Sequence, residues 1–167
     1  FTYNKVDFYL AQTFKRSQYQ REGLYRNGIY ADNSYGKGDK VIFENFGFKG
    51  GLTYKITGRH LLDFNAMYMT AAPTMRNSFS NARLNNNFTP NLESESISSA
   101  DVSYIIRAPK LKARLTAFGS QIKNSTEISF FYAENIGDTD GDEDSFVSEI
   151  VTSVDKQNIG LELGLEY

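Results

Sequence analysis

The sequence predicts an all-β protein of antiparallel, up-and-down strands that form part of a larger transmembrane β-barrel. Three observations lead to this prediction. Six stretches place apolar residues at every second position, short turns alternate with long polar connections, and aromatic residues lie near both ends of the apolar phase. Together these features are typical of barrels that cross a bilayer with tilted strands.

The first three alternating stretches lie in the N-terminal half of the chain. They are KVDFYLAQTF (5–14), NFGFKGGLTYKI (45–56) and LLDFNAMY (61–68). Alternation over this length predicts a strand with one apolar face, because successive side chains of a strand point to opposite faces. The apolar phases run from Val6 to Phe14, from Phe46 to Ile56 and from Leu62 to Tyr68.

The last three stretches are SADVSYII (99–106), LKARLTAF (111–118) and the closing NIGLELGLEY (158–167). Their apolar phases run from Ala100 to Ile106, from Leu111 to Ala117 and from Ile159 to Tyr167. Apolar residues at the three- and four-residue spacing of a helix are not sustained anywhere in the chain, so helices are not predicted.

The intervening positions carry all the charge of the six stretches. No charged residue stands in the apolar phase, whereas the opposite phase holds Lys5, Asp7, Lys49, Lys55, Asp63, Asp101, Lys112, Arg114, Glu162 and Glu166. We therefore expect the apolar phase to face lipid and the opposite phase to face a wet interior.

The connections alternate between short and long. TGRH (57–60) and RAPK (107–110) predict tight turns, because Gly and Pro suit turn geometry. The predicted long connections, about 15–44, 70–98 and 119–156, all lie at the other end of the strands. Long loops without structure are uncommon in compact domains, but outer-membrane barrels combine short turns at one end with long loops at the other.

Aromatic residues of the apolar phase lie near both ends of the predicted strands. Tyr54, Tyr104 and Tyr167 fall at the end with the tight turns, and Phe14, Phe46 and Tyr68 fall at the end with the long connections. This placement indicates two aromatic girdles at the membrane interfaces. A soluble β-sandwich, the alternative fold, would place such residues centrally against a second sheet.

About six strands cannot close a barrel, since the smallest common form has about eight. An open sheet would leave unpaired backbone groups in lipid. Residues 1–167 are therefore interpreted as one segment of a larger barrel domain, whose other strands and plug lie outside this sequence.

Composition excludes several functions. The chain has 18 basic and 20 acidic residues, so its net charge of -2 gives no broad electrostatic case for binding nucleic acid. It has no cysteine and one histidine, His60, in a predicted turn. A catalytic triad or a multi-histidine metal site is thus not available, and no enzymatic activity is predicted.

Several segments of the sequence resemble those of one family of receptors. They are YQREGLYRNG (19–28), SYGKG (34–38), GLTYKITGRH (51–60), AAPTMRNSFSNARLNNN (71–87), PNLESE (90–95), TEISFFYAE (126–134) and VDKQNIGLELGLEY (154–167). They resemble the TonB-dependent outer-membrane receptors of Bacteroidota, which carry a carboxypeptidase-regulatory-like N-terminal domain, a plug and a barrel of the 22-stranded type.

The resemblance implies a receptor in the bacterial outer membrane that captures a scarce nutrient and takes it up with energy. The nutrient would be a siderophore, an oligosaccharide or a peptide. The implied partners are the lipid bilayer, the TonB energy-transducing complex through another part of the chain, and a surface lipoprotein. The alternative function is that of a soluble β-sandwich module that binds carbohydrate.

Two candidate sites lie in the long connections. Arg21, Tyr25, Arg26 and Arg76 are candidate ligand-binding residues, because loops on a rigid scaffold often bind ligands and Arg suits carboxylates. The same residues could instead pack the loops together. No cofactor is predicted apart from calcium.

The candidate calcium loop is DTDGDEDSFVSE, residues 138–149. Five of its six acidic residues occupy the first, third, fifth, seventh and twelfth positions of a calcium-binding loop. The sixth position, normally Gly, is Glu143. A solvated acidic loop tip is the alternative interpretation. The candidate ligands are Asp138, Asp140, Asp142, Asp144 and Glu149.

Overall fold

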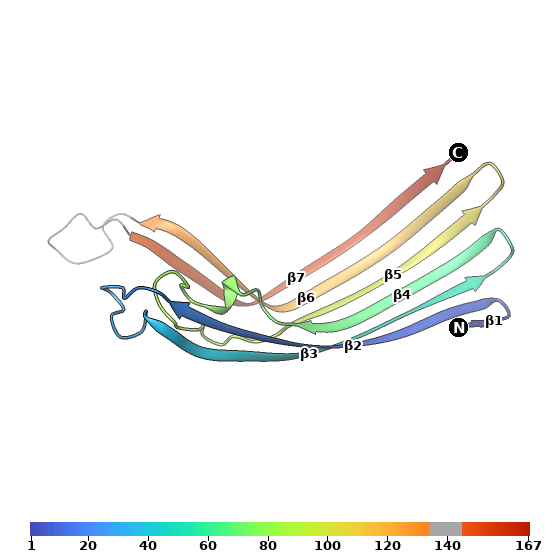
Figure 1. The fold of residues 1–167 in the computed structure, drawn as a ribbon. Helices are drawn as coiled ribbons and strands as arrows, with labels where there is room; N and C mark the ends of the chain where they lie inside the picture. The colour runs from blue at the N-terminus through green and yellow to red at the C-terminus, as the bar shows by residue number, and fades with distance from the viewer. Residues whose placement is uncertain (134–144) are drawn as a thin grey trace.

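The computed structural model describes residues 1–133 and 145–167, which form one antiparallel sheet with the strand order β1-β2-β3-β4-β5-β6-β7. Each strand pairs with its neighbours in the chain (Figure 1). The bounds are β1 Thr2–Tyr3, β2 Val6–Gly23, β3 Gly36–Lys55, β4 His60–Ala71, β5 Glu95–Arg107, β6 Lys112–Ala133 and β7 Ser145–Glu166, with one 3-10 turn, η1, at Arg76–Ser78. The predicted all-β, up-and-down topology is confirmed.

One strand more than the predicted six is present. The additional strand, β1, has two residues and pairs Tyr3 with Val6. Asn4 takes a positive φ of 53° in the turn between them, a conformation that Asn tolerates better than most residues. So short a strand leaves too little alternation to be recognised in the sequence.

The register of the ladder brings the six apolar phases onto one face. A first row across the sheet consists of Phe8, Leu52, Phe64, Val102, Ala117 and Leu161. The next row toward the tight turns consists of Val6, Tyr54, Leu62, Tyr104, Leu115 and Leu163. A slip of one residue in any strand would break these rows, because it would move that strand's apolar side chains to the other face.

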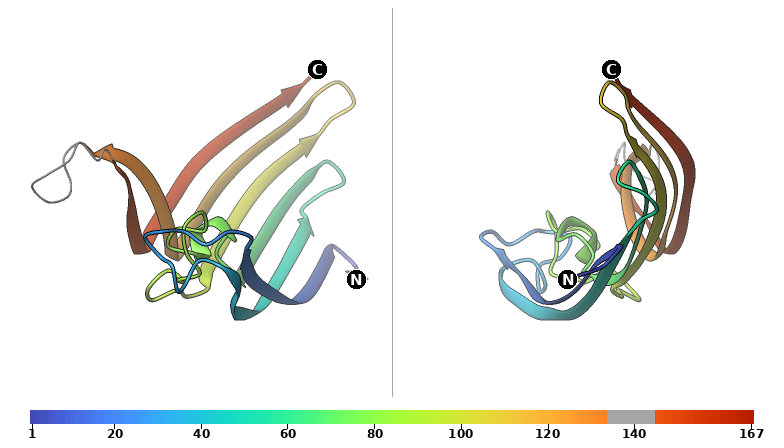
Figure 2. Two further views of the ribbon diagram at one scale, coloured as in Figure 1. Left: turned by 60° about the vertical axis from the view of Figure 1, so that its left-hand side comes forward. Right: turned by 90° about the vertical axis from the view of Figure 1, so that its right-hand side faces the viewer.

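The sheet curves into a trough, and the connection between β4 and β5 lies within the curve (Figure 2). The polar phase faces this concave side, because Tyr19 and Arg21, which continue the polar phase of β2, hydrogen-bond to the connection within the curve. The apolar phase therefore faces the convex side. Convex side chains are strongly exposed, and Leu161 retains 78% of its accessible surface. Among the described residues no second sheet covers them. The few buried apolar side chains of the described part are Phe43, Leu61, Phe79 and Ile128.

Both tight turns are present where the sequence predicts them. In the first, the backbone N–H groups of Arg59 and His60 donate to the hydroxyl of Thr57 at 3.2 and 3.1 Å. In the second, Ala108 N–H donates to the carbonyl oxygen of Leu111 at 2.8 Å. Both turns lie at the same end of the sheet, opposite the long connections (Figure 1).

The predicted long connections are wrong in extent. The structure continues β2 to Gly23, starts β3 at Gly36, continues β6 to Ala133 and starts β7 at Ser145. These extensions mix polar residues with apolar residues in consecutive positions, such as Val41–Phe43 in β3 and Phe130–Tyr132 in β6, so they lack the alternation from which strands were predicted. Backbone hydrogen bonds hold a ladder together whether or not one face is apolar. Only the connection 72–94 retains most of its predicted length.

The β6–β7 hairpin changes direction where its ladder is irregular (Figure 1). Asn124 and Ser153 both have a positive φ there, of 58° and 59°. Bulges bend the strand that contains them. The outer half of this hairpin is therefore set at an angle to the rest of the sheet.

Candidate functional site

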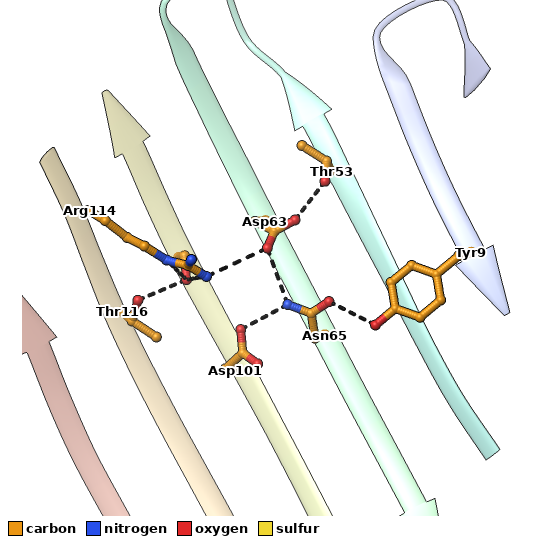
Figure 3. A network of polar contacts seen from close by, with 8 residues as sticks. Tyr9, Thr53, Asp63, Asn65, Asp101, Arg114 and Thr116 are labelled. Carbon is orange, nitrogen blue, oxygen red and sulfur yellow. Dashed lines mark hydrogen bonds and ion pairs between the residues drawn. The ribbon is translucent and has the colours of Figure 1, made fainter. Parts of the chain in front are cut away.

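A continuous polar network crosses the concave face from β2 to β6 (Figure 3). At its centre, the amide nitrogen of Asn65 donates to Asp63 Oδ2 at 3.2 Å and to Asp101 Oδ2 at 3.1 Å. Tyr9 Oη donates to Asn65 Oδ1 at 3.3 Å, and Thr53 Oγ1 donates to Asp63 Oδ1 at 2.6 Å. Both carboxylates are thus held in place by neighbouring strands.

Arg114 on β6 completes the network. Its Nη2 lies 3.8 Å from Asp63 Oδ2, and its Nε and Nη2 donate to the hydroxyl of Ser103 at 3.2 and 3.1 Å. Ser103 is fully buried and lies 2.9 Å from Thr116 Oγ1. Asp63, Ser103 and Arg114 all stand in the polar phase of their strands, which the sequence pattern predicted to face a wet interior.

Opposite charges on this face are paired across neighbouring strands. Lys55 Nζ lies 2.7 Å from Asp7 Oδ2, and Lys112 Nζ lies 2.8 Å from Glu166 Oε1. Such exposed pairs contribute little to stability, typically about 0–1 kcal/mol each. Because of these pairs, the positive and negative charges of the concave face largely compensate each other.

Two aromatic rings lie over strand glycines on the concave face. A Cβ atom built on Gly51 would lie 2.4 Å from Cε1 of Tyr9, and one built on Gly160 would lie 2.4 Å from Cζ of Phe118. Each ring therefore occupies the space that a side chain would otherwise fill, which is a known use of glycine in strands. Tyr9 and Phe118 remain 47% and 40% exposed.

A hollow of about 520 Å³ opens on the concave face beside the ring of Phe118. Its polar lining comes from three neighbouring strands, with Asp101 on β5, Arg114 and Thr116 on β6, and Glu162 on β7. Ligand pockets typically measure roughly 300–1,000 Å³. The hollow thus has the size of a small-ligand site and offers one aromatic surface, hydrogen-bond acceptors and hydrogen-bond donors.

Arg21, a predicted ligand-binding residue, joins three segments in the structure. Its Nε donates to the carbonyl oxygen of Ala82 at 2.7 Å, and its Nη1 donates to Ser34 O at 2.9 Å and to Asn86 Oδ1 at 2.5 Å. These bonds tie the end of β2 to the connections 24–35 and 72–94. The guanidinium therefore holds these loops together, and its contact with a ligand stays a prediction.

The other predicted ligand-binding residues do not converge with Arg21. Tyr25 and Arg26 are exposed in the connection 24–35. Arg76 lies in η1, with its guanidinium carbon 5.9 Å from the ring centre of Phe130 on β6, a distance at which cation and ring attract. Arg76 also borders a hollow that contains Glu149.

The candidate calcium loop falls mostly outside the described residues, which include neither Asp138, Asp140, Asp142 nor Asp144. Glu149 is described on β7, where its Oε2 accepts a hydrogen bond from Ser129 Oγ at 3.3 Å. Within 1–133 and 145–167, no three His, Asp or Glu side chains lie close enough together to hold a metal ion.

The sequence did not single out Tyr9 and Phe118 as site residues. Both stand in the polar phase, and a single aromatic residue among charged residues does not by itself indicate a binding site. What singles them out is the residue opposite each of them on the neighbouring strand. In one row of the sheet, Tyr9 pairs with Gly51 and Phe118 pairs with Gly160. Only a correct register brings each glycine beside its ring.

The chain matches no family model, no curated protein and no solved structure. Among the described residues there is also no helix with the length and apolar character to cross a bilayer.

Proposed function

We propose that the chain is a segment of the transmembrane barrel of a TonB-dependent outer-membrane receptor, with the 22-stranded type of barrel that the sequence resemblance implies. The observation that carries this proposal is the apolar convex face. Its rows run unbroken across six strands, and its large side chains are exposed although monomeric soluble proteins rarely expose apolar patches beyond a few hundred Å². Lipid would cover such a face.

The two edges of the sheet support a larger barrel. In the described part of the chain, β7 pairs on one side only, with β6, and the opposite edge is formed by β2 with the two-residue β1. Backbone groups at such edges cannot stay unpaired in a bilayer. Further strands of the receptor would pair with both edges and close the barrel.

In this proposal the concave face lines the lumen and the long strand extensions rise above the outer membrane surface. The extensions and the connection 72–94 would meet a scarce nutrient first, with Tyr25, Arg26 and Arg76 as candidate contacts. Uptake would require the plug and the TonB complex, and a surface lipoprotein would assist capture. Calcium in the loop 138–149 stays part of the proposal. The proposal includes neither nucleic-acid binding nor catalysis.

The isolated 167 residues are expected to associate in water. Their exposed convex face and unpaired β7 edge would both seek partners. Sedimentation velocity of the refolded fragment with and without detergent measures this, with aggregates expected in plain buffer and dispersed protein in detergent. A monodisperse, cooperatively melting monomer without detergent would favour the soluble carbohydrate-binding alternative.

A further inference from the structure

We infer that the end of the sheet with the tight turns binds the headgroups of anionic phospholipids, such as phosphatidylglycerol, in the bilayer leaflet that it meets. This inference rests on the proposed function, because a barrel wall in a bilayer brings these turns to the surface of a leaflet. It adds the lipid chemistry and the side chains that select it. These side chains, called the turn bases below, are Lys5, Arg59, Arg107 and Lys110.

The three tight turns carry a base at the same position. Backbone hydrogen bonds close each turn around two residues at its tip, and the second of the two is Lys or Arg. These bases are Lys5 between β1 and β2, Arg59 between β3 and β4, and Lys110 between β5 and β6. All three are exposed, and none of the tips contains an acidic residue. Positive charge therefore recurs along this end of the sheet.

The turn bases are not neutralised by the described part of the chain. On the adjoining strands, bases are paired with acids, since Lys55 Nζ lies 2.7 Å from Asp7 Oδ2 and Lys112 Nζ lies 2.8 Å from Glu166 Oε1. Those acids are thus already engaged. Within 1–133 and 145–167, no ion pair includes a turn base. Their charge is left for a group outside these residues.

Two of the turn bases stand directly opposite each other. Arg107, the last residue of β5, donates its backbone N–H to the carbonyl oxygen of Arg59 at 2.8 Å, one step beyond the last register pair of the β4–β5 ladder. Arg107 also pairs with Lys112 across the β5–β6 ladder. Like charges directly opposite are destabilising, and an anion beside them would remove that cost. A phosphate suits this place, because a guanidinium matches phosphate oxygens in geometry.

Tyrosines beside the turns set their depth in the bilayer. Tyr54 and Tyr104 stand in one row of the convex face, each opposite Leu62. Tyr104 Oη lies 2.7 Å from His60 Nδ1, and the two rings stack with their centres 5.9 Å apart. Tyr side chains favour the level of the headgroups. The turn bases lie further along the strands, so their long side chains reach the phosphates at the edge of the apolar band.

A layer of headgroups fits the spacing of the turn bases better than an acidic segment of the plug does. The turns lie side by side along one end of the sheet (Figure 1). Neighbouring tips are two strand spacings apart, or roughly 10 Å. A leaflet surface offers phosphates along the whole of this edge, whereas a single acidic segment would engage part of it.

The test is electron paramagnetic resonance on the intact receptor in liposomes, with spin-labelled phosphatidylglycerol and phosphatidylcholine as probes. A base beside a headgroup favours the anionic lipid about fivefold. Averaged over the lipids around the barrel, the association constant of phosphatidylglycerol should therefore exceed that of phosphatidylcholine. This preference should fall in about 1 M salt, which screens charges beyond roughly 3 Å. It should vanish in the quadruple variant with Lys5→Gln, Arg59→Gln, Arg107→Gln and Lys110→Gln.

The matched control neutralises four exposed bases in the other half of the sheet, which form no ion pair with the described residues: Lys15, Lys37, Lys40 and Lys123. With all four changed to Gln, the lipid preference should equal that of the parent. The double variant Arg59→Lys and Arg107→Lys keeps the charge and should also retain the preference.

Heat-modifiable barrel bands, measured on every protein, separate this inference from the proposed function. An assembled parent without a preference, a quadruple Gln variant that keeps it, or a control that loses it equally would overturn the headgroup site alone. Faster proteolysis of the plug in the quadruple variant, with an unchanged lipid preference, would assign the turn bases to the plug instead. A parent without a barrel band would overturn the proposed function as well.

Discussion

Leu161→Arg in the proposed full-length receptor is expected to abolish outer-membrane assembly. Leu161 belongs to the row of Phe8 and Phe64, which lies between the two aromatic girdles and hence near the middle of the apolar band. An Arg at the bilayer midplane on the lipid face of a barrel costs about 2–4 kcal/mol. Heat-modifiable migration of outer-membrane fractions measures the folded barrel, and little or none is expected.

The matched control is Glu162→Arg, one residue along the same strand and on the concave face. It introduces the same side chain at nearly the same depth, so its assembly should equal that of the parent. Equal barrel bands for both variants would show that an Arg is tolerated equally on the convex and the concave face of β7. They would then contradict the assignment of the convex face.

The second large effect is expected from Phe79→Ala in the connection 72–94. Phe79 is 2% exposed, and its ring centre lies 5.1 Å from that of Phe88. Truncating a buried Phe typically costs about 3–5 kcal/mol. The connection should open locally while the barrel persists, because Phe79 lies outside the strands that form the sheet. Trypsin cleavage after Arg76 or Arg83 should accelerate about 100-fold or more, since each 1.4 kcal/mol is a factor of ten.

Met75→Ala is the control for that experiment, because Met75 lies in the same connection and is 56% exposed. Its cleavage rate should stay close to that of the parent. A Phe79→Ala protein cleaved no faster than Met75→Ala would mean that the connection is held by its hydrogen bonds alone. Those bonds include Asn77 Nδ2 to Thr126 O at 2.6 Å and Tyr19 Oη to Pro73 O at 3.1 Å.

The parts of the fold that could be predicted from the sequence are the strands in which apolar and polar residues alternate, and the tight turns between them. Leu161 and Glu162 stand on opposite faces of the sheet, as alternation predicted. The turns at 57–60 and 107–110 also lie where Gly and Pro indicated. In both cases the determining interaction is local, since it depends on neighbouring residues and on the two-residue period of a strand.

The rest depends on contacts between distant residues. The extension of β6 to Ala133 rests on backbone pairing with β7, and its apolar residues, among them the consecutive Phe130 and Phe131, follow no two-residue period. The partners of Arg21 could not be predicted, because Ala82 and Asn86 lie about sixty residues away in the chain. Likewise, the aromatic surface of Phe118 becomes visible only when Gly160 is placed opposite it.

The lipid contact of the convex face is tested most directly by site-directed spin labelling along β7. Residues 1–167 contain no cysteine, so once any cysteine elsewhere in the receptor is replaced by serine, single cysteine substitutions from Asn158 to Leu165 each place one label at a known position. In the full-length receptor reconstituted into liposomes, collisions with oxygen report lipid and collisions with a water-soluble nickel complex report the aqueous phase. Oxygen accessibility should peak at Ile159, Leu161, Leu163 and Leu165 and fall at each residue between them. Labels at those four positions that are shielded from both reagents, or an oxygen profile without a two-residue period, would contradict a lipid-facing barrel wall.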